Sequence, residues 1–257
     1  PLALGLYEAV VFNRSRQFEW QYLNPVILYR SVEAALGSPD NVLIGLNGRW
    51  DVLRRVRLYG QLMLDEFLFS ALVKPEDRGW WGNKYGVQAG AHYINALDID
   101  HLDVQAEWNY VRPYTYSHGD SLNSYTHYRQ PLAHPLWANF KEVLVLVRYQ
   151  PFLRWTITGR FLHANMGENT ARENWGANPL LGYTSRVADY GNFTGQGVAG
   201  RLQTVGLDVT WQFYHNVFLD LKWLSRGKKS DDPARRLNTH IFTAGVRMNL
   251  YPQNYDF

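Results

Sequence analysis

Apolar and polar residues alternate at every second position in much of this 257-residue chain, and this alternation constrains its fold most. In a β-strand, successive side chains point to opposite faces, so such a segment makes one apolar and one polar face. The pattern recurs in nine segments: 43–51, 56–65, 84–93, 101–110, 143–149, 155–161, 204–213, 217–226 and 242–250. A tenth apolar segment, 2–12, has ambiguous parity. We therefore predict an all-β protein with ten antiparallel strands.

The amino-acid composition excludes several classes of protein. Hydrophobic residues make up 46% of the chain, yet no run approaches the roughly 20 apolar residues that a membrane-spanning helix needs. A membrane β-barrel remains compatible, because its apolar residues occupy alternate positions. The absence of cysteine excludes disulfide frameworks and thiolate metal sites, and a net charge of +3 gives no indication of nucleic-acid binding.

The links between the predicted strands sort by length. Short links lie near 51–55, 96–100, 151–154 and 214–217. Long links cover about 13–41, 68–83, 114–141, 165–200 and 228–238. Short and long links alternate along the chain, as the periplasmic turns and extracellular loops of a transmembrane barrel do. We expect one domain, 1–257, and because the chain opens at Pro1 without a signal peptide we expect an N-terminal part to be missing.

Aromatic residues lie near both ends of the apolar face, which carries no charge in the nine segments. The aromatic residues near the short links are Trp50, Tyr93, Tyr149, Trp155 and Phe213, and those near the long links are Tyr85, Tyr110, Phe161, Trp223 and Phe242. Two aromatic girdles around an aliphatic band are typical of a barrel in the bacterial outer membrane, so we predict an antiparallel transmembrane β-barrel with its long loops extracellular and its short turns periplasmic. The alternative is that aromatics are simply good strand formers in a soluble sheet.

Several long links carry more specific motifs. They are residues 22–33 (YLNPVILYRSVE), 37–41 (GSPDN), 79–84 (GWWGNK), 111–116 (VRPYTY), 131–135 (PLAHP) and 173–176 (ENWG). Together, and in this order, they resemble the Wzi-type capsule assembly family. The resemblance implies a barrel of about eighteen strands, of which ten lie here, and a role in binding capsular polysaccharide at the cell surface. Related proteins occur beside gliding and secretion systems, so the resemblance leaves the wider role open.

Side chains in the long links are candidates for polysaccharide binding. Exposed Trp rings can stack on sugars, and Arg presents a planar fork to carboxylates. The candidates are Trp80, Trp81, Arg112, Arg129, Trp137 and Trp175. The tryptophans could instead pack within the loops. Arg112, Arg129, Arg172 and Lys141 could equally pair with loop acids or lipopolysaccharide phosphates.

Charges on the polar face have mixed sign, which favours cross-strand ion pairs over a channel lining. They are Arg49, Arg57, Asp65, Asp103, Glu107, Arg148, Arg160, Asp208, Lys222, Arg226 and Arg247. Residues 25–36 are expected to form a short helix ending at Gly37.

No catalytic motif stands out. Nucleophile-elbow and His-Glu-x-x-His patterns are missing, and Glu168 with Glu173 is too weak a signal for glycoside cleavage or calcium. We expect no enzyme activity, cofactor or metal. The predicted function is the binding and positioning of acidic surface polysaccharide. Lipid, lipopolysaccharide and other outer-membrane proteins are the further expected partners. The alternative is a pore or an accessory subunit of a secretion, gliding or assembly complex.

Overall fold

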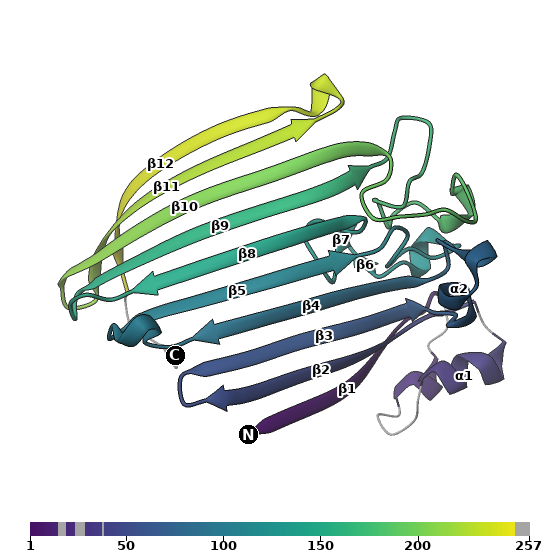
Figure 1. Ribbon diagram of the computed structural model, residues 1–257, viewed down its shortest axis with the longest axis horizontal. Coiled ribbons are helices and arrows are strands. Elements are labelled where there is room, and N and C mark those ends of the chain that lie inside the picture. Colours follow the sequence, from purple (N-terminus) through teal and green to yellow (C-terminus); the bar gives the residue numbers. More distant parts are fainter. Residues whose placement is uncertain (15–18, 24–28, 38, 250–257) are drawn as a thin grey trace, which may run out of the picture.

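A computed structural model describes residues 1–14, 19–23, 29–37 and 39–249. Its main element is one curved antiparallel sheet in which each strand pairs with the next long strand of the chain (Figure 1). In sheet order the strands are β1 (Leu2–Val11), β2 (Asn41–Leu53), β3 (Val56–Glu66), β4 (Lys84–Tyr93), β5 (Leu102–Val111), β8 (Phe140–Tyr149), β9 (Trp155–Glu168), β10 (Val198–Tyr214), β11 (Val217–Ser230) and β12 (Leu237–Met248). The all-β prediction and its ten strands are confirmed.

Short elements fill the links. They are η1 (Trp20–Leu23), α1 (Tyr29–Leu36), α2 (Ser70–Val73), η2 (Pro75–Asp77), η3 (Ala96–Asp98), η4 (Ser121–Asn123), β6 (Thr126–His127), β7 (Gln130–Pro131), η5 (Tyr183–Ser185) and η6 (Pro233–Arg235). Helix α1 confirms part of the helix predicted over 25–36 and is followed by Gly37 at φ +60°, but residues 24–28 lie outside the described part. In the described ranges no helix is long and apolar enough to cross a membrane.

Links of different length lie at opposite ends of the sheet. Links 67–83, 112–139 and 169–197, with the described parts of link 12–40, gather at the end beside α1 and α2, which we call the loop end (Figure 1). The prediction of a long loop over 228–238 is wrong, because β11 and β12 continue pairing up to Lys228 and Leu237. Near residues 225–230 polar residues occupy both faces of β11, so the apolar–polar alternation ends there although the backbone pairing continues.

Cross-strand register defines the two faces. Directly paired residues share a face, so the pairs Leu2–Trp50 and Leu6–Leu46 place the leucines of β1 on the apolar face and settle its parity. The predicted girdle residues lie on this face: Tyr85 and Tyr110 are 6.0 Å apart near the loop end, and Trp155 stacks on Trp211 at 5.5 Å near the other end. Large apolar side chains on this face are exposed, including Trp223 at 40% and Phe242 at 72%.

The buried core lies at one end of the sheet. It forms where link 112–139 packs on the polar face, and its members are Leu43, Met63, Val111, Tyr116, Ala138 and Phe140. Elsewhere on the polar face, ion pairs join neighbouring strands, as the mixed charges predict: Arg57–Asp51 at 2.7 Å, Arg247–Asp220 at 3.0 Å, and Arg160–Asp208. The loop end is therefore the packed part of the molecule.

Candidate functional site

Link 112–139 is fixed to the polar face by a buried ion pair. The side chains of Lys84 and Asp65 are both inaccessible to solvent, and their Nζ and Oδ1 atoms are 3.1 Å apart. The link's backbone completes the pair: the amide of Tyr116 donates to Asp65 Oδ2 at 2.8 Å, and Lys84 Nζ donates to the carbonyl of Ser117 at 2.9 Å. These bonds satisfy both charges, as burial requires. The link is therefore a fixed part of the site.

Asn139 joins links 112–139 and 169–197. Its Nδ2 donates to the carbonyls of Gly167 at 3.0 Å and Gln196 at 2.9 Å, and its Oδ1 accepts from the amide of Gly195 at 2.7 Å. The residue is fully buried, and its φ of +62° is a left-handed conformation that Asn adopts more readily than most residues. Links 112–139 and 169–197 thus form one hydrogen-bonded cap over the loop end.

His118 lies within this cap, in link 112–139. Its Nδ1 accepts a hydrogen bond from the amide of Asp120 at 3.3 Å, and its ring meets Tyr183 edge-on at 5.6 Å. Burial lowers the pKa of His118 below its ordinary 6.5, and the nearby Lys84 ammonium lowers the pKa further, while Glu66 and Asp120 partly oppose this. The cap therefore favours the neutral imidazole.

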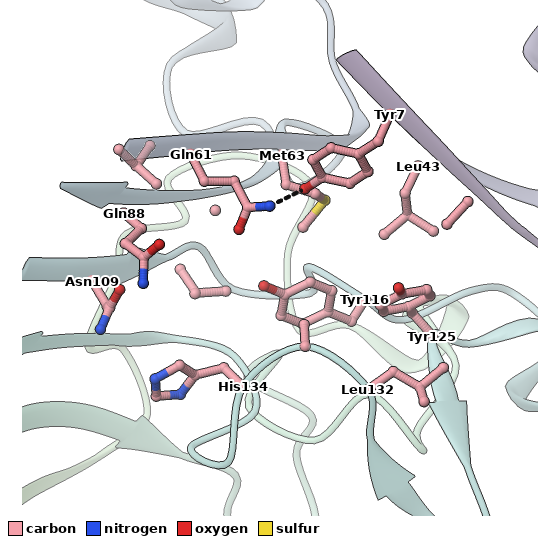
Figure 2. Close-up of a pocket in the computed structure, with 15 residues that line it drawn as sticks. Tyr7, Leu43, Gln61, Met63, Gln88, Asn109, Tyr116, Tyr125, Leu132 and His134 are labelled. Atoms are coloured by element: carbon pink, nitrogen blue, oxygen red, sulfur yellow. Dashed lines mark hydrogen bonds between the residues drawn. The ribbon is translucent and has the colours of Figure 1, made fainter. Parts of the chain in front are cut away.

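A cavity of about 300 Å³ lies between link 112–139 and strands β1–β5 (Figure 2). Its polar lining consists mainly of three amides and three phenols, from Gln61, Gln88, Asn109, Tyr7, Tyr116 and Tyr125. Figure 2 shows these groups converging on the cavity, with Gln61 bonded to Tyr7 at 2.8 Å. No Asp, Glu, Lys or Arg lines it, so it suits water or a small neutral ligand.

Carboxylates behind the cavity orient its amides. Gln88 Nε2 donates to Glu107 at 3.3 Å, and Asn109 Nδ2 donates to Glu142 at 2.9 Å. His134 accepts from the Leu136 amide at Nδ1, so its Nε2 donates to Glu142 at 3.0 Å. Each amide NH₂ group thus has one N–H engaged, and this fixes the direction in which its amide oxygen is offered to a ligand.

A groove of about 490 Å³ lies on the other side of the segment 132–138. This segment lines the cavity with residues 132–134 and the groove with residues 135–138. The side chains that give the groove its chemistry are Trp137, Glu168, Asn178, Arg226, Lys228 and Arg235. It therefore combines an aromatic ring, an amide and three cations at the loop end of the polar face.

The groove carries excess positive charge. Its one carboxylate, Glu168, is 2.7 Å from Lys228 Nζ and 3.8 Å from Arg235 Nη1. Arg235 also contacts Asp232 at 3.0 Å. Arg226 is exposed and has no ion-pair partner among the described residues. A guanidinium beside a half-buried indole is suited to an acidic sugar, because it can pair with the carboxylate while the ring stacks on the sugar.

Three of the predicted binding residues hold links together. Trp81 packs 4.5 Å from Tyr183, and the guanidinium of Arg186 lies 4.3 Å over its ring. Arg112 is 9% exposed and donates to the carbonyls of Trp80 and Asn192, both at 3.4 Å. The ring of Trp80 lies 5.9 Å from that of Trp81. These contacts join links 67–83, 112–139 and 169–197 to one another.

The other three candidates lie in different places. Trp175 donates from Nε1 to Glu173 at 3.1 Å, and Arg129 lies exposed in the tight turn between β6 and β7, where φ is +60°. Only Trp137 lines the cationic groove. The alternation in 217–226 predicted Arg226 on the polar face. Lys228 and Arg235 were not predicted, although the same alternation continued for two more residues places Lys228 on that face.

The described residues hold no group of three or more His, Cys, Asp or Glu arranged for a metal ion. Glu168 and Glu173 have separate partners, Lys228 and Trp175. No protein-family model matches the chain, and no curated protein matches its sequence. The resemblance to the Wzi-type family therefore stays a prediction from the loop motifs.

Proposed function

We propose that this chain forms part of the wall of an outer-membrane β-barrel of the Wzi-type family, and that it binds acidic surface polysaccharide. The groove at the loop end carries the proposal, because Trp137 stands there beside Arg226, Lys228 and Arg235. The mechanism is binding and positioning of the polymer, without turnover.

The exposed apolar face supports placement in a membrane. Soluble monomers seldom expose contiguous apolar patches larger than a few hundred Å², whereas here Leu46, Leu58, Leu207 and Trp223 are between 40% and 48% exposed on one face. The sorted links support an orientation in which the loop end lies outside the cell and the opposite end in the periplasm.

The two edge strands of the sheet, β1 and β12, support a barrel with more strands than these ten. Within the described ranges, β1 pairs with β2 alone and β12 with β11 alone. Unpaired strand edges do not occur in the hydrocarbon layer, because nothing there satisfies their amides and carbonyls. We propose that further strands close the barrel, up to the approximately eighteen that the resemblance implies.

Polysaccharide retention by the purified protein in detergent tests the binding role. Trp137→Ala and Arg226→Gln should each weaken retention of a uronate-rich polymer, and salt should weaken it further because screening acts on exposed charges. Arg129→Gln removes a cation outside the groove and should leave retention unchanged. Equal retention of a neutral dextran, or equal loss in all three variants, would contradict the proposal.

The polar face of β9–β12 favours a pore as the second candidate. Link 112–139 buries part of the N-terminal strands, while Arg160, Asp208 and Lys222, together with Leu144, Leu162, Leu224 and Ile241, line a hollow of about 310 Å³. The charged part of this lining is suited to contact with water. Discrete conductance steps in a planar bilayer would support this role, and silence would remove it.

A further inference from the structure

A row of polar and basic side chains crosses the apolar face near the loop end. Register pairs Tyr110 with Lys141, Lys141 with Asn165, Asn165 with Arg201, and Arg201 with Lys229. These residues belong to five consecutive strands of the sheet, and neighbouring strands are about 4.8 Å apart. They therefore form one continuous line, in which three of the four residues after Tyr110 are cations.

The three cations have no carboxylate partner among the described residues. Lys141 Nζ lies 5.8 Å from the centre of the Tyr110 ring, and Arg201 Nε donates to Asn165 Oδ1 at 3.3 Å. Lys229 is exposed and has no described ion pair. On the polar face, Arg57, Arg160 and Arg247 each pair with an Asp, and Arg226 is a cation there without a described ion pair. An anion from outside the chain would supply the missing charge.

Part of the row lines a hollow of about 590 Å³. Asn165, Arg201 and Lys229 contribute to it, and the link between β11 and β12 adds Asp231 and Arg236. Arg236 donates from Nε to the carbonyl of Ser230 at 2.9 Å, which holds the Nε side of its guanidinium in place. Three cations thus face one carboxylate around a space of ligand size.

Position along the strands identifies the occupant. Arg201 lies four residues beyond the exposed Val205, or about 13 Å along β10. In a strand tilted by about 45°, this becomes about 9 Å above the apolar band, close to the headgroup layer, which adds about 5–8 Å on each side of the hydrocarbon. Long Arg and Lys side chains can reach down into that layer.

We propose that Arg201, Lys229 and Arg236, extended by Lys141, form an outward-facing site for the phosphates of a membrane lipid headgroup. This inference rests on the proposed membrane placement and is separate from the polysaccharide groove, since Arg226 and Lys228 lie on the opposite face of β11. Bidentate guanidinium contacts would hold the phosphates.

Native mass spectrometry of the detergent-purified protein can test the site, with bisphosphorylated lipid A as the probe. The double variant Arg201→Gln/Lys229→Gln should bind about 25-fold more weakly, since each surface cation contributes roughly a fivefold factor toward an anionic lipid surface. The matched control is Arg148→Gln/Lys222→Gln, which removes two polar-face cations and should bind as the parent does.

Each remaining arm can overturn the proposal. Equal binding of dephosphorylated lipid A would exclude phosphate recognition, and full competition by inorganic phosphate would assign the site to free phosphate. An equal loss of lipid A binding in both double variants would show that binding depends only on the net charge of the protein. Polysaccharide retention by Arg201→Gln/Lys229→Gln should stay at the parent level. If lipid A binding is unaffected by the variant while polysaccharide retention is as expected, only the lipid-site proposal is contradicted and the groove proposal is not.

Discussion

The two halves of the polar face share one strand pattern but differ in what covers them. Over β1–β5, the covered half, link 112–139 buries Lys84, Asp65 and a shared apolar core. Over β9–β12, the open half, the Arg160 and Arg247 side chains are both 48% exposed within their ion pairs. The alternation that builds the sheet therefore does not determine which part of the polar face is buried. The links that pack on this face determine it.

The buried pair should give the largest difference between the halves. Lys84→Met leaves Asp65 buried without a counter-charge, so the free energy of unfolding should fall by about 3–5 kcal/mol. Arg160→Met in the open half should cost less than about 1 kcal/mol, because its pair is solvated. Denaturant unfolding in detergent micelles measures both.

The double variant Lys84→Met/Asp65→Asn serves as the control for that experiment. It removes the unpaired charge, while the side-chain amide oxygen introduced at position 65 can still accept from the backbone amide of Tyr116. Most of the lost stability should therefore return. Equal losses for Lys84→Met and Arg160→Met would remove the distinction between the halves.

Asn139 tests whether the cap acts as a unit. Asn139→Ala removes side-chain bonds to Gly167, Gly195 and Gln196 and leaves buried backbone groups unpaired. Unfolding should become easier by about 2–3 kcal/mol. Hydrogen exchange should rise in both 112–139 and 169–197. A rise confined to one link would show that the two fold independently.

The pH dependence of the covered half gives a smaller effect. The pKa of His118 is lower in the folded than in the unfolded protein, so the unfolded state binds more protons as the pH falls below 6.5. Stability is thus fully present above that pH and declines below it, by at most about 1.4 kcal/mol per pH unit. His118→Gln should flatten the Tm profile between pH 7 and 5. If the dependence of Tm on pH is the same in His118→Gln as in the parent, a group other than His118 is responsible for it.

The strands were predictable and the site was not, for physical reasons. Period-two alternation is a local property of the sequence, so the strand Leu102–Val111 could be predicted from its own residues. The tryptophans were judged by exposure, which depends on distant partners: Tyr183 and Arg186 pack on Trp81, about a hundred residues away in the chain. Lys228 and Arg235 were missed because the apolar signal ends before β11 does. Trp137 was identified as a candidate, but the cations beside it were not assigned to one site.

Lipid exposure of alternate positions in β10 tests the central claim most directly. The chain contains no cysteine, so single Cys residues at 204–209 can be spin-labelled without background. In proteoliposomes, labels at 205, 207 and 209 should be accessible to oxygen and protected from a water-soluble nickel chelate, while labels at 204, 206 and 208 should show the reverse. Uniform access of the chelate to all six positions would contradict a membrane-spanning sheet with one lipid-facing side.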